Sequence, residues 1–417
     1  MRIIRTHATK IAHLPVNLKP GYGSRINMLP TILYFWPLNH HSFQLMKIGI
    51  LGGGQLGRML LQEAANYPVE TWVMEKDPDC PAAHLCHHFI TGDIRDYDAV
   101  YAFGQYVDGL TIEIENVNVE ALEKLESEGK FIVPKPSALH TIKNKILQKQ
   151  YYQSNDIPSP GFHITQNHID LKIRESFLPA VHKLAMGGYD GKGVQLILDK
   201  SDLGKGFDAP SILEKMIDIE KEIAVTVAIG KKGEHALYPP VEMIFDPRLN
   251  LLDYQLCPAD IPQKTLWKAE AIALTVARNF SSPGLFAIEM FIDKKGDIYV
   301  NETAPRVHNS GHHTIEAHYS SQFDMLWRIL LGYPLGNTTM ILPSIMVNLV
   351  GEPGFQGRPV YEGLQEILEI DNAFVHIYGK SQTVPGRKMG HITIMHPDKQ
   401  DLLRQANKVK RILKVKT

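Results

Sequence analysis

The sequence predicts an α/β domain built on a parallel sheet, followed by α+β regions with antiparallel sheet. Three observations support this fold class. Strand-like and helix-like segments alternate from residue 46 to 136, which is typical of βαβ units with helices on both faces of a sheet. From about residue 141 to 330, short β-rich runs replace this alternation. After Gly332, three more strands and a basic helix (Asp398–Lys414) predict a small β-rich domain.

Length and composition limit the possible classes of protein. At 417 residues the chain is too long for one ordinary core, so we expect two or three domains. Hydrophobic residues at 44% and charged residues at 21% are typical of a soluble globular protein. The net charge of -1 gives no basic excess that would indicate a nucleic-acid partner. An anionic ligand must therefore be held by local residues.

Apolar runs and cysteines indicate the compartment. No apolar run approaches the ~20 residues that span a bilayer, so we expect no membrane partner. Cys80, Cys86 and Cys257 form no CxxC pair, and their odd number fits a reducing compartment, which predicts a cytoplasmic location.

Residues 1–45 differ from the rest because they contain no Asp or Glu but several basic residues. Such a segment can be a targeting peptide, yet no small-residue cleavage site follows its apolar run at residues 29–38. The favoured interpretation is that synthesis begins at Met46, one residue before the first strand. Residues 1–45 are therefore treated as an extension outside the fold.

The first domain opens on a strand and a glycine-rich turn. In order, we expect strand KIGIL, a helix around Leu56–Asn66, strands TWVME and FITGD, a helix around Tyr97–Val107, strand GLTIEI, helix Val119–Glu128 and strand FIVP. Gly52-x-Gly54-x-x-Gly57 follows the first strand, and Glu75 lies 18 positions beyond Gly57. This formally completes a dinucleotide-binding fingerprint, so an NAD-dependent oxidoreductase is one interpretation.

The middle region begins with a helical stretch, Ser137–Ser154. The β-rich runs that follow are PAVHKL, VQLIL, SILEKMI, EIAVTVAI, ALYPPVEMIF and LLDYQLC. A long helix, Gln263–Phe280, precedes the strands LFAIEMFID and DIYVNETAP. The last region has strands SIMVNLV, FVHIYGK and HITIMH before its helix.

A second glycine-rich turn, MGGYDGKG at residues 186–193, lies between two strands of the middle region. Its backbone N–H groups could close over phosphates, although the segment is no Walker A loop. An ordinary hairpin turn is the alternative, and the pattern alone does not separate the two. Lys183 lies on the apolar strand before this turn, where an inward lysine needs an anionic partner.

A pair of carboxylates follows on two later strands. Glu289 lies in AIEMF, and Glu302 lies beside Asn301 in YVNETAP. The short KKG connection predicts a hairpin in which residues whose numbers sum to about 590 face each other. Glu289 should therefore lie opposite Asn301 or Glu302. Two carboxylates and an amide among apolar residues predict hard oxygen ligands for Mg²⁺ beside nucleotide phosphates.

The segment APRVHNSGHHT, directly after the second carboxylate strand, is rich in hydrogen-bond donors suited to a phosphate or carboxylate. His308 and His312 would suggest zinc on a helix, but Pro305 and Gly311 argue against a helix there. The histidines at 84, 87 and 88 are interpreted as surface or packing residues. Arg387–Lys388 in PGRKMGH, taken alone, would be a solvated basic turn.

These motifs, in this order, resemble the 5-(carboxyamino)imidazole ribonucleotide synthase family of the ATP-grasp superfamily. The resemblance runs from Met46 to about residue 400 and rests on GGGQLGRM, GGYDGKG, NETAPRVHNSGH and PGRKMGH. It implies a Rossmann-like pre-ATP-grasp domain at 46–140, an ATP-grasp domain at 141–332 and a C-terminal domain at 333–417. It also implies that the first glycine turn serves a ribonucleotide substrate rather than NAD.

The resemblance implies a role for each motif residue. The residues expected to bind ATP are Lys145, Lys183, Gly188, Tyr189, Asp190, Gly191, Lys192, Gly193, Glu214, Lys215, Met216, Ile217, Glu222, Asn301 and Glu302. Those expected to bind substrate are Gly54, Gln55, Leu56, His308, Asn309, Ser310, Arg387 and Lys388. Those expected to be catalytic are Tyr189, Asp190, Arg306 and Lys388. Mg²⁺ or Mn²⁺ would be held by Glu289, Asn301 and Glu302.

The implied reaction has two stages. Bicarbonate attacks the γ-phosphate of ATP to give carboxyphosphate, and the 5-amino group of 5-aminoimidazole ribonucleotide then captures carboxyphosphate or CO2 released from it. A homodimer is the oligomeric state that the family suggests. Two departures stand out, since some relatives have a histidine near Phe245 and an arginine at Lys145, and a lysine lacks the bidentate geometry of arginine.

Several alternatives stay open. The nearest is another ATP-grasp ligase, the formate-dependent glycinamide ribonucleotide transformylase; a biotin carboxylase is disfavoured because the chain is short for one. An NAD-dependent oxidoreductase rests on the first glycine turn and Glu75 alone. A non-catalytic nucleotide-binding module is disfavoured by the complete phosphate and metal set, which a ligase needs and a dehydrogenase does not.

Overall fold

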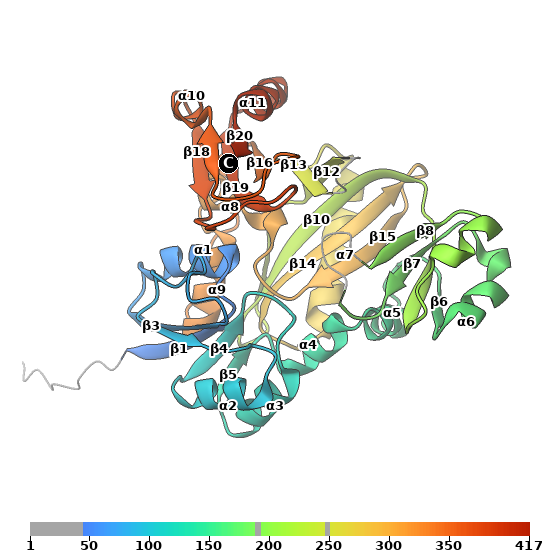
Figure 1. Ribbon diagram of the computed structural model, residues 1–417, viewed down its shortest axis with the longest axis horizontal. Coiled ribbons are helices and arrows are strands. Elements are labelled where there is room, and N and C mark those ends of the chain that lie inside the picture. Colours follow the sequence, from blue (N-terminus) through green and yellow to red (C-terminus); the bar gives the residue numbers. More distant parts are fainter. Residues whose placement is uncertain (1–44, 188–192, 247–250) are drawn as a thin grey trace, which may run out of the picture. The chain divides into compact units, whose positions relative to one another are not determined.

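The computed structural model describes residues 45–187, 193–246 and 251–417, and the predicted N-terminal extension up to residue 44 lies outside them. Leu45–Thr417 form one compact unit, drawn in Figure 1. Within the described ranges, no helix has the length and apolar character needed to cross a membrane.

The first sheet is parallel throughout, with strand order β3-β2-β1-β4-β5. Its strands are β1 Met46–Leu51, β2 Val69–Glu75, β3 His88–Thr91, β4 Gly109–Ile112 and β5 Phe131–Val133. The connecting helices are α1 Gln55–Ala64, α2 Tyr97–Gln105 and α3 Val119–Ser127. The predicted alternation and parallel sheet are therefore confirmed.

Helices cover both faces of this sheet (Figure 1). On one face, α1 packs with α9 (Gln322–Leu331) from much later in the chain, and the buried Trp327 indole donates to the Leu60 carbonyl at 2.7 Å. On the other face, α2 and α3 pack with α4 (Pro136–Lys143). Apolar spacing along each helix places one face of it in the core.

The predicted helical stretch at 137–154 consists of two helices, α4 and α5 (Lys145–Ser154). They are separated by Asn144, whose backbone is extended (φ -113°, ψ 114°). The Asn144 side chain accepts hydrogen bonds from the N–H groups of Ile146 and Leu147, so it caps α5 rather than continuing α4. The break turns Lys145 and Lys149 toward the middle of the molecule.

A four-stranded antiparallel sheet follows, in the order β6-β9-β7-β8. Its strands are β6 Phe162–Thr165, β7 Ala180–Leu184, β8 Val194–Ile197 and β9 Ser211–Lys215. Helix α6 and two short 3₁₀ turns accompany them, at His168–Ile173, Glu175–Phe177 and Lys200–Lys205.

The largest sheet has nine strands, with the path β15-β14-β10-β12-β13-β16-β19-β18 and β11 paired to β10. Its strands are β10 Ile219–Ile229, β11 His235–Leu237, β12 Val241–Asp246, β13 Leu251–Cys257, β14 Gly284–Asp293, β15 Ile298–Ala304, β16 Ser344–Val350, β18 Ala373–Ile377 and β19 Lys388–Met395. Because β13 pairs with β16, this sheet continues across residue 333. The predicted domain boundary there stays a proposal.

One predicted β-rich run in this sheet contains two strands. ALYPPVEMIF forms two strands, β11 and β12, on either side of Pro239 and Pro240. Proline has no N–H to donate to a strand ladder, so the run cannot continue through the pair.

The remaining elements surround the large sheet. They are α7 Gln263–Asn279, the 3₁₀ turn Asn309–Gly311, α8 Thr314–Ala317, β17 Val360–Glu362, α10 Leu364–Leu368, α11 Lys399–Ile412 and β20 Lys414–Lys416. Helix α7 packs its buried alanines against β10 and β14, and α11 packs against β16 and β19. The predicted final helix ends two residues early, because Lys414 begins a strand that pairs with β17.

The first glycine turn is filled by the protein's own carboxylates. Buried Glu113, just after β4, accepts hydrogen bonds from the N–H groups of Gly54 (2.5 Å) and Leu56 (3.1 Å). Glu75 accepts from the N–H of Gly53 at 3.2 Å. A dinucleotide pyrophosphate would need these same N–H groups, so the turn is poorly suited to NAD.

We predict that Gly57→Ala destabilises the chain, because a Cβ at Gly57 would lie 2.9 Å from the Gly52 carbonyl oxygen. That contact is with backbone and cannot be relieved by rotating a side chain, so the free energy of unfolding should fall by about 1–3 kcal/mol. Gly161→Ala is the control, since a Cβ there meets nothing within 4 Å. Urea denaturation measures both variants, and equal stability of the two would contradict the predicted clash.

We also predict that Glu113→Gln changes how stability depends on pH. Burial raises the pKa of Glu113, although the N–H groups of Gly54, Gly57 and Leu56 oppose this. A folded pKa above the unfolded value of about 4.3 adds stability below that pH, which is lost as pH rises through the folded pKa. Wild-type unfolding free energy should therefore fall across this window relative to Glu113→Gln. Parallel curves in urea titrations at several pH values would refute the assignment.

Candidate active site

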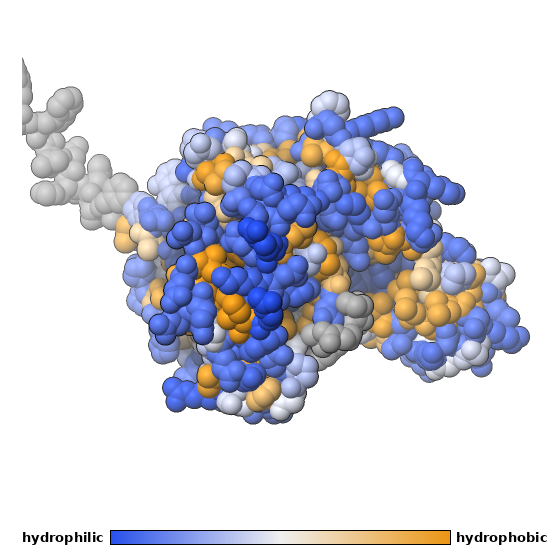
Figure 2. Space-filling model, turned by 90° about the horizontal axis from the view of Figure 1, so that it is seen from above, coloured by the Kyte–Doolittle hydropathy of each residue, from blue (hydrophilic) through white to orange (hydrophobic). Residues whose placement is uncertain are grey.

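A cavity of about 390 Å³ lies where the four-stranded sheet faces the large sheet. Figure 2 shows the surface hollowed beside the lobe that carries the four-stranded sheet, where hydrophobic residues also gather. Predicted site residues lining this cavity are Lys145, Lys183, Glu214, Lys215, Met216, Ile217, Glu222, Glu289, Asn301, Glu302, His308, Asn309 and Lys388. A further cavity of about 730 Å³ beside α11 contains no predicted site residue.

The hairpin of β14 and β15 positions the carboxylate pair. Glu289 lies directly opposite Glu302, and the next pair is Met290 with Val300. Asn301 is therefore the extra residue of a β-bulge, a feature that re-aims side chains. The predicted pairing of Glu289 with Asn301 or Glu302 is resolved in favour of Glu302, with all three side chains lining the cavity.

Lysines compensate only part of the negative charge of this pair. Lys145 Nζ lies 2.8 Å from Glu302, and this attraction holds the pKa of Glu302 below its usual range. Burial and the neighbouring Glu302 raise the pKa of Glu289. The Glu302 side chain is 42% exposed because it faces the open cavity. Two carboxylates and an amide are the hard oxygen donors that Mg²⁺ prefers, so these residues fit a divalent cation.

A buried ion-pair network forms the floor beside this pair. Glu214 on β9 is 3.1 Å from Lys149 and 2.5 Å from Lys183, and Lys183 also donates to Asn301 Oδ1 at 2.9 Å. Burial alone would raise the pKa of Glu214, but the two lysines lower it. Glu214 lines the cavity as predicted, and its carboxylate contacts the two lysines.

The sequence motifs did not indicate Lys149. The one sequence feature that could have pointed to it is its position four residues after Lys145 on the same helix, because residues at this spacing share a helix face.

The far side of the cavity is less polar. Met216 is 41% exposed and Leu196 is 52% exposed, and both line the cavity. Burial raises the pKa of Glu222 to about 7, an effect that Lys183 opposes. The Lys215 ammonium donates to the Phe177 carbonyl at 3.0 Å. An apolar wall beside a polar floor is the usual form of a site for a nucleotide or similar ligand.

The segment after β15 enters the cavity at His308 and Asn309. Burial lowers the pKa of His308 to about 3, so its imidazole is neutral, and its Nδ1 lies 2.9 Å from Ser310 Oγ. The Asn309 side chain is 6% exposed, and neither of its amide atoms has a hydrogen-bond partner among the described residues. Buried polar groups are nearly always paired, so Asn309 marks a place where a ligand group fits.

Other predicted residues lie elsewhere. Arg306 Nε lies 2.9 Å from Glu115 of the first domain, and Ser310 lies behind His308. Arg387 is exposed and donates to the Gln382 carbonyl at 2.8 Å, so its side chain lies outside the cavity that Lys388 lines. None of these three residues lines the cavity.

The first glycine turn connects to the cavity indirectly. Gln55 Oε1 accepts from Lys380 Nζ at 2.6 Å, and Lys380 also donates to the Lys388 carbonyl at 2.6 Å. Lys380 is thus a link between the turn and a cavity-lining residue. The sequence carried no signal for it beyond its place at the end of a predicted strand.

The second glycine turn is described only at its edges. Gly188, Tyr189, Asp190, Gly191 and Lys192 lie outside the described residues. Gly187 and Gly193 have positive φ values of 81° and 80°, and the Gly193 carbonyl accepts from the Leu184 N–H. The predicted lid over phosphates therefore stays a prediction.

Family models match most of the chain. The ribonucleotide synthetase preATP-grasp domain matches residues 45–143, the ATP-grasp domain matches 150–323, and the phosphoribosylaminoimidazole carboxylase C-terminal domain matches 344–405. Together they confirm the predicted three-part architecture.

Two solved structures share the fold at substantial identity. N5-carboxyaminoimidazole ribonucleotide synthetase from Thermotoga maritima has a TM-score of 0.83 and 39% identity, over 89% of this chain and 100% of that one. The N5-carboxyaminoimidazole synthase from Aspergillus clavatus, in complex with ADP and 5-aminoimidazole ribonucleotide, has a TM-score of 0.80 and 31% identity, over 88% and 99%.

Curated relatives fall into two lengths. The chain spans 64% of the chloroplastic phosphoribosylaminoimidazole carboxylase of Vigna aconitifolia, at 36% identity over 362 residues, which are 84% of this chain. It covers 92% of the N5-carboxyaminoimidazole ribonucleotide synthase of Staphylococcus epidermidis, at 34% identity over 359 residues, again 84% of this chain. The motifs, the three matched domains and this coverage agree: the chain belongs to the N5-carboxyaminoimidazole ribonucleotide synthase family of ATP-grasp enzymes.

Proposed function

We propose that the chain carboxylates 5-aminoimidazole ribonucleotide on its 5-amino group, using ATP and bicarbonate, in purine biosynthesis. The observation that carries this proposal is the convergence of Lys145, Lys183 and the carboxylates Glu289 and Glu302 on one cavity. Phosphoryl transfer depends on positioning and on neutralising charge, and this arrangement suits both. The names of the relatives supply the substrate and the product.

Lys145 and Lys183 are the residues that bind the phosphates of ATP in this proposal. Both ammonium groups already contact oxygen atoms of Glu302, Glu214 or Asn301. A phosphate arriving beside them would share these donors, and the two ammonium groups would offset part of its negative charge. Mg²⁺ or Mn²⁺ held by Glu289, Asn301 and Glu302 would neutralise charge on the phosphates during transfer.

The substrate side of the cavity is assigned to His308, Asn309 and Lys388. The unpaired amide of Asn309 can donate to and accept from a polar substrate. The low pKa of His308 makes it a weak base, so we assign it a role in orienting substrate through Nε2 while Ser310 holds Nδ1. Bicarbonate is expected between this side and the ATP phosphates, and Lys388 lines the same space.

Two chemical stages follow from this arrangement. A bicarbonate oxygen forms a bond to the γ-phosphorus and ADP leaves, which gives carboxyphosphate. The 5-amino group then takes the carboxyl carbon and inorganic phosphate leaves, with the amine proton passing to phosphate or solvent. Carboxyphosphate hydrolyses readily in water, so the proposal assigns residues 187–193 to a lid that excludes solvent. Tyr189 and Asp190 of that lid keep their predicted catalytic roles as part of the proposal.

Other predicted features belong to the same proposal. They are the substrate contacts of Gly54, Gln55, Leu56, Arg306 and Arg387, the domain boundaries at 140 and 332, a homodimer and a cytoplasmic location. Arg306 would act by holding the segment before His308 through Glu115. Light scattering of the purified chain checks the dimer.

The function itself is tested by ADP release from Mg²⁺-ATP with 5-aminoimidazole ribonucleotide, in buffer stripped of bicarbonate and after bicarbonate is added back. We expect turnover only when both are present, because carboxyphosphate needs bicarbonate and its capture needs the amine. Turnover that is independent of bicarbonate but requires formate and glycinamide ribonucleotide would contradict this function and favour the transformylase alternative.

We predict that Glu302→Ala lowers ATP turnover by at least about 100-fold while the chain stays folded. Mg²⁺ would lose a ligand in this variant, and the phosphate charge would then be poorly neutralised. Glu242→Ala is a matched control: Glu242 is also paired with a lysine in the large sheet, at 3.0 Å from Lys221, but does not line the cavity. It should keep turnover within a few-fold of wild type. Normal turnover in folded Glu302→Ala would remove the metal assignment.

A further inference from the structure

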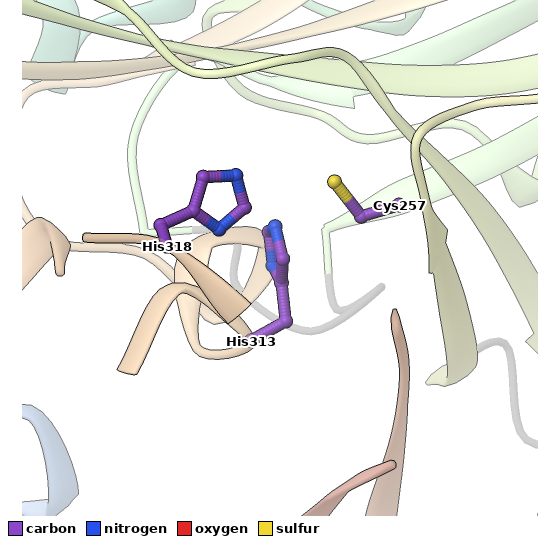
Figure 3. Close-up of side chains that lie close together, drawn as sticks. All are labelled: Cys257, His313 and His318. Atoms are coloured by element: carbon purple, nitrogen blue, oxygen red, sulfur yellow. The ribbon is translucent and has the colours of Figure 1, made fainter. Parts of the chain in front are cut away.

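A cluster of soft metal-binding side chains lies outside the cavity. Cys257, His313 and His318 are 1%, 1% and 3% exposed, and one potential ligand atom from each lies within 4.8 Å of the other two. Figure 3 shows the three side chains pointing toward one another. None of them lines the active-site cavity.

The cluster joins two separate parts of the chain. Cys257 ends β13, while His313 and His318 flank the short helix α8 (Figure 3). His318 also forms an isolated β-bridge with Met340. A bond between the two parts would therefore tie the segment after β15, which carries His308 and Asn309, to the large sheet.

The nitrogen atoms of this cluster lack partners. His313 Nε2 and both ring nitrogens of His318 are buried and have no hydrogen-bond partner among the described residues. Leaving such groups unpaired is destabilising. Cys257 is a free thiol and adds no strong donor. Two buried imidazoles with unpaired nitrogens close to one thiol are better explained by a ligand than by packing.

The other ring nitrogen of His313, Nδ1, already has a polar neighbour. This Nδ1 lies 2.9 Å from Gln255 Nε2, which also donates to the Ser310 carbonyl at 2.7 Å. Coordination through Nε2 would place the ring proton on Nδ1, so the Gln255 amide would rotate to present its unpaired Oε1 to that proton. An outer hydrogen bond of this kind is the usual support of a metal-bound histidine.

We propose that Cys257, His313 and His318 bind a zinc ion that fastens the active-site segment to the large sheet. A thiolate and two imidazoles suit Zn²⁺, whereas Mg²⁺ prefers the oxygen donors of the cavity. Ligand atoms on tetrahedral zinc are roughly 3.3–3.6 Å apart, so small side-chain rotations close the observed spacing. The fourth position goes to water or to Ser344, whose buried, unpaired hydroxyl is on the residue opposite Cys257 in the sheet.

Binding requires one proton to leave. The Cys257 S–H bond breaks, its sulfur forms a bond to zinc, and the proton passes to solvent. The two histidines bind as neutral imidazoles, so the site has a net charge of about +1 when filled. The proposal does not depend on the proposed carboxylation, because it concerns different residues and a different class of metal.

Cobalt binding tests the proposal, because a cysteine thiolate bound to Co²⁺ gives a charge-transfer absorption that oxygen ligands do not. The full chain is stripped of metal and titrated with Co²⁺, and bound zinc is then measured after Zn²⁺ displaces the cobalt. We expect about one equivalent of each metal per chain, with the thiolate absorption present. A wild-type chain without this absorption would overturn the proposal.

Variants locate the metal. Cys257→Ala should abolish the thiolate absorption, and His318→Gln should weaken cobalt binding by about 10- to 100-fold. Cys86→Ala, a free cysteine outside the cluster, should behave as wild type, and so should Glu302→Ala, because its oxygen site gives no thiolate absorption. Unchanged absorption in Cys257→Ala would overturn the proposal, even if His318→Gln fails to fold. Zn²⁺ should also raise the melting temperature of wild type more than that of Cys257→Ala.

Discussion

The buried charges between α5, β7, β9 and β15 are the constraint on which the site depends. Glu214 is held between Lys149 and Lys183, and Lys183 reaches on to Asn301. Removing one member of such a network leaves a buried charge without a partner, which is strongly destabilising. The same contacts that make the charges tolerable also hold Lys183 at the wall of the cavity. In the proposed function, folding and phosphate binding therefore depend on one set of ion pairs.

The first glycine turn and Asn309 illustrate one rule about where ligands bind. At the first turn, Glu113 and Glu75 satisfy the N–H groups, so that turn needs no pyrophosphate. At Asn309 a buried amide is left without a partner. Because unpaired buried groups are costly, they indicate the positions that a substrate completes. A glycine pattern alone does not distinguish a filled turn from an empty one.

Local periodicity predicted most elements of the first sheet and the carboxylate hairpin, because strand alternation and a short connection determine both within a residue. The bulge at Asn301 decides that Glu289 pairs with Glu302 rather than with Asn301, and the sequence gives no sign of this bulge. Lys380 was missed because its partner, Gln55, is 325 positions away. Arg387 was expected beside substrate because of the family resemblance, but it is exposed and donates to the Gln382 carbonyl, just before β19 begins at Lys388. Sequence patterns indicate residue types and register, whereas long-range pairing decides which side chains meet.

In the proposed reaction, bicarbonate attacks ATP directly in the cavity lined by Lys145, Glu289 and Glu302. The most direct measurement follows ¹⁸O from labelled bicarbonate during turnover with ATP and 5-aminoimidazole ribonucleotide. The oxygen that attacks the γ-phosphorus stays with it when carboxyphosphate breaks down, so we expect ¹⁸O in the inorganic phosphate. Phosphate free of label, formed while bicarbonate-dependent product accumulates, would contradict it.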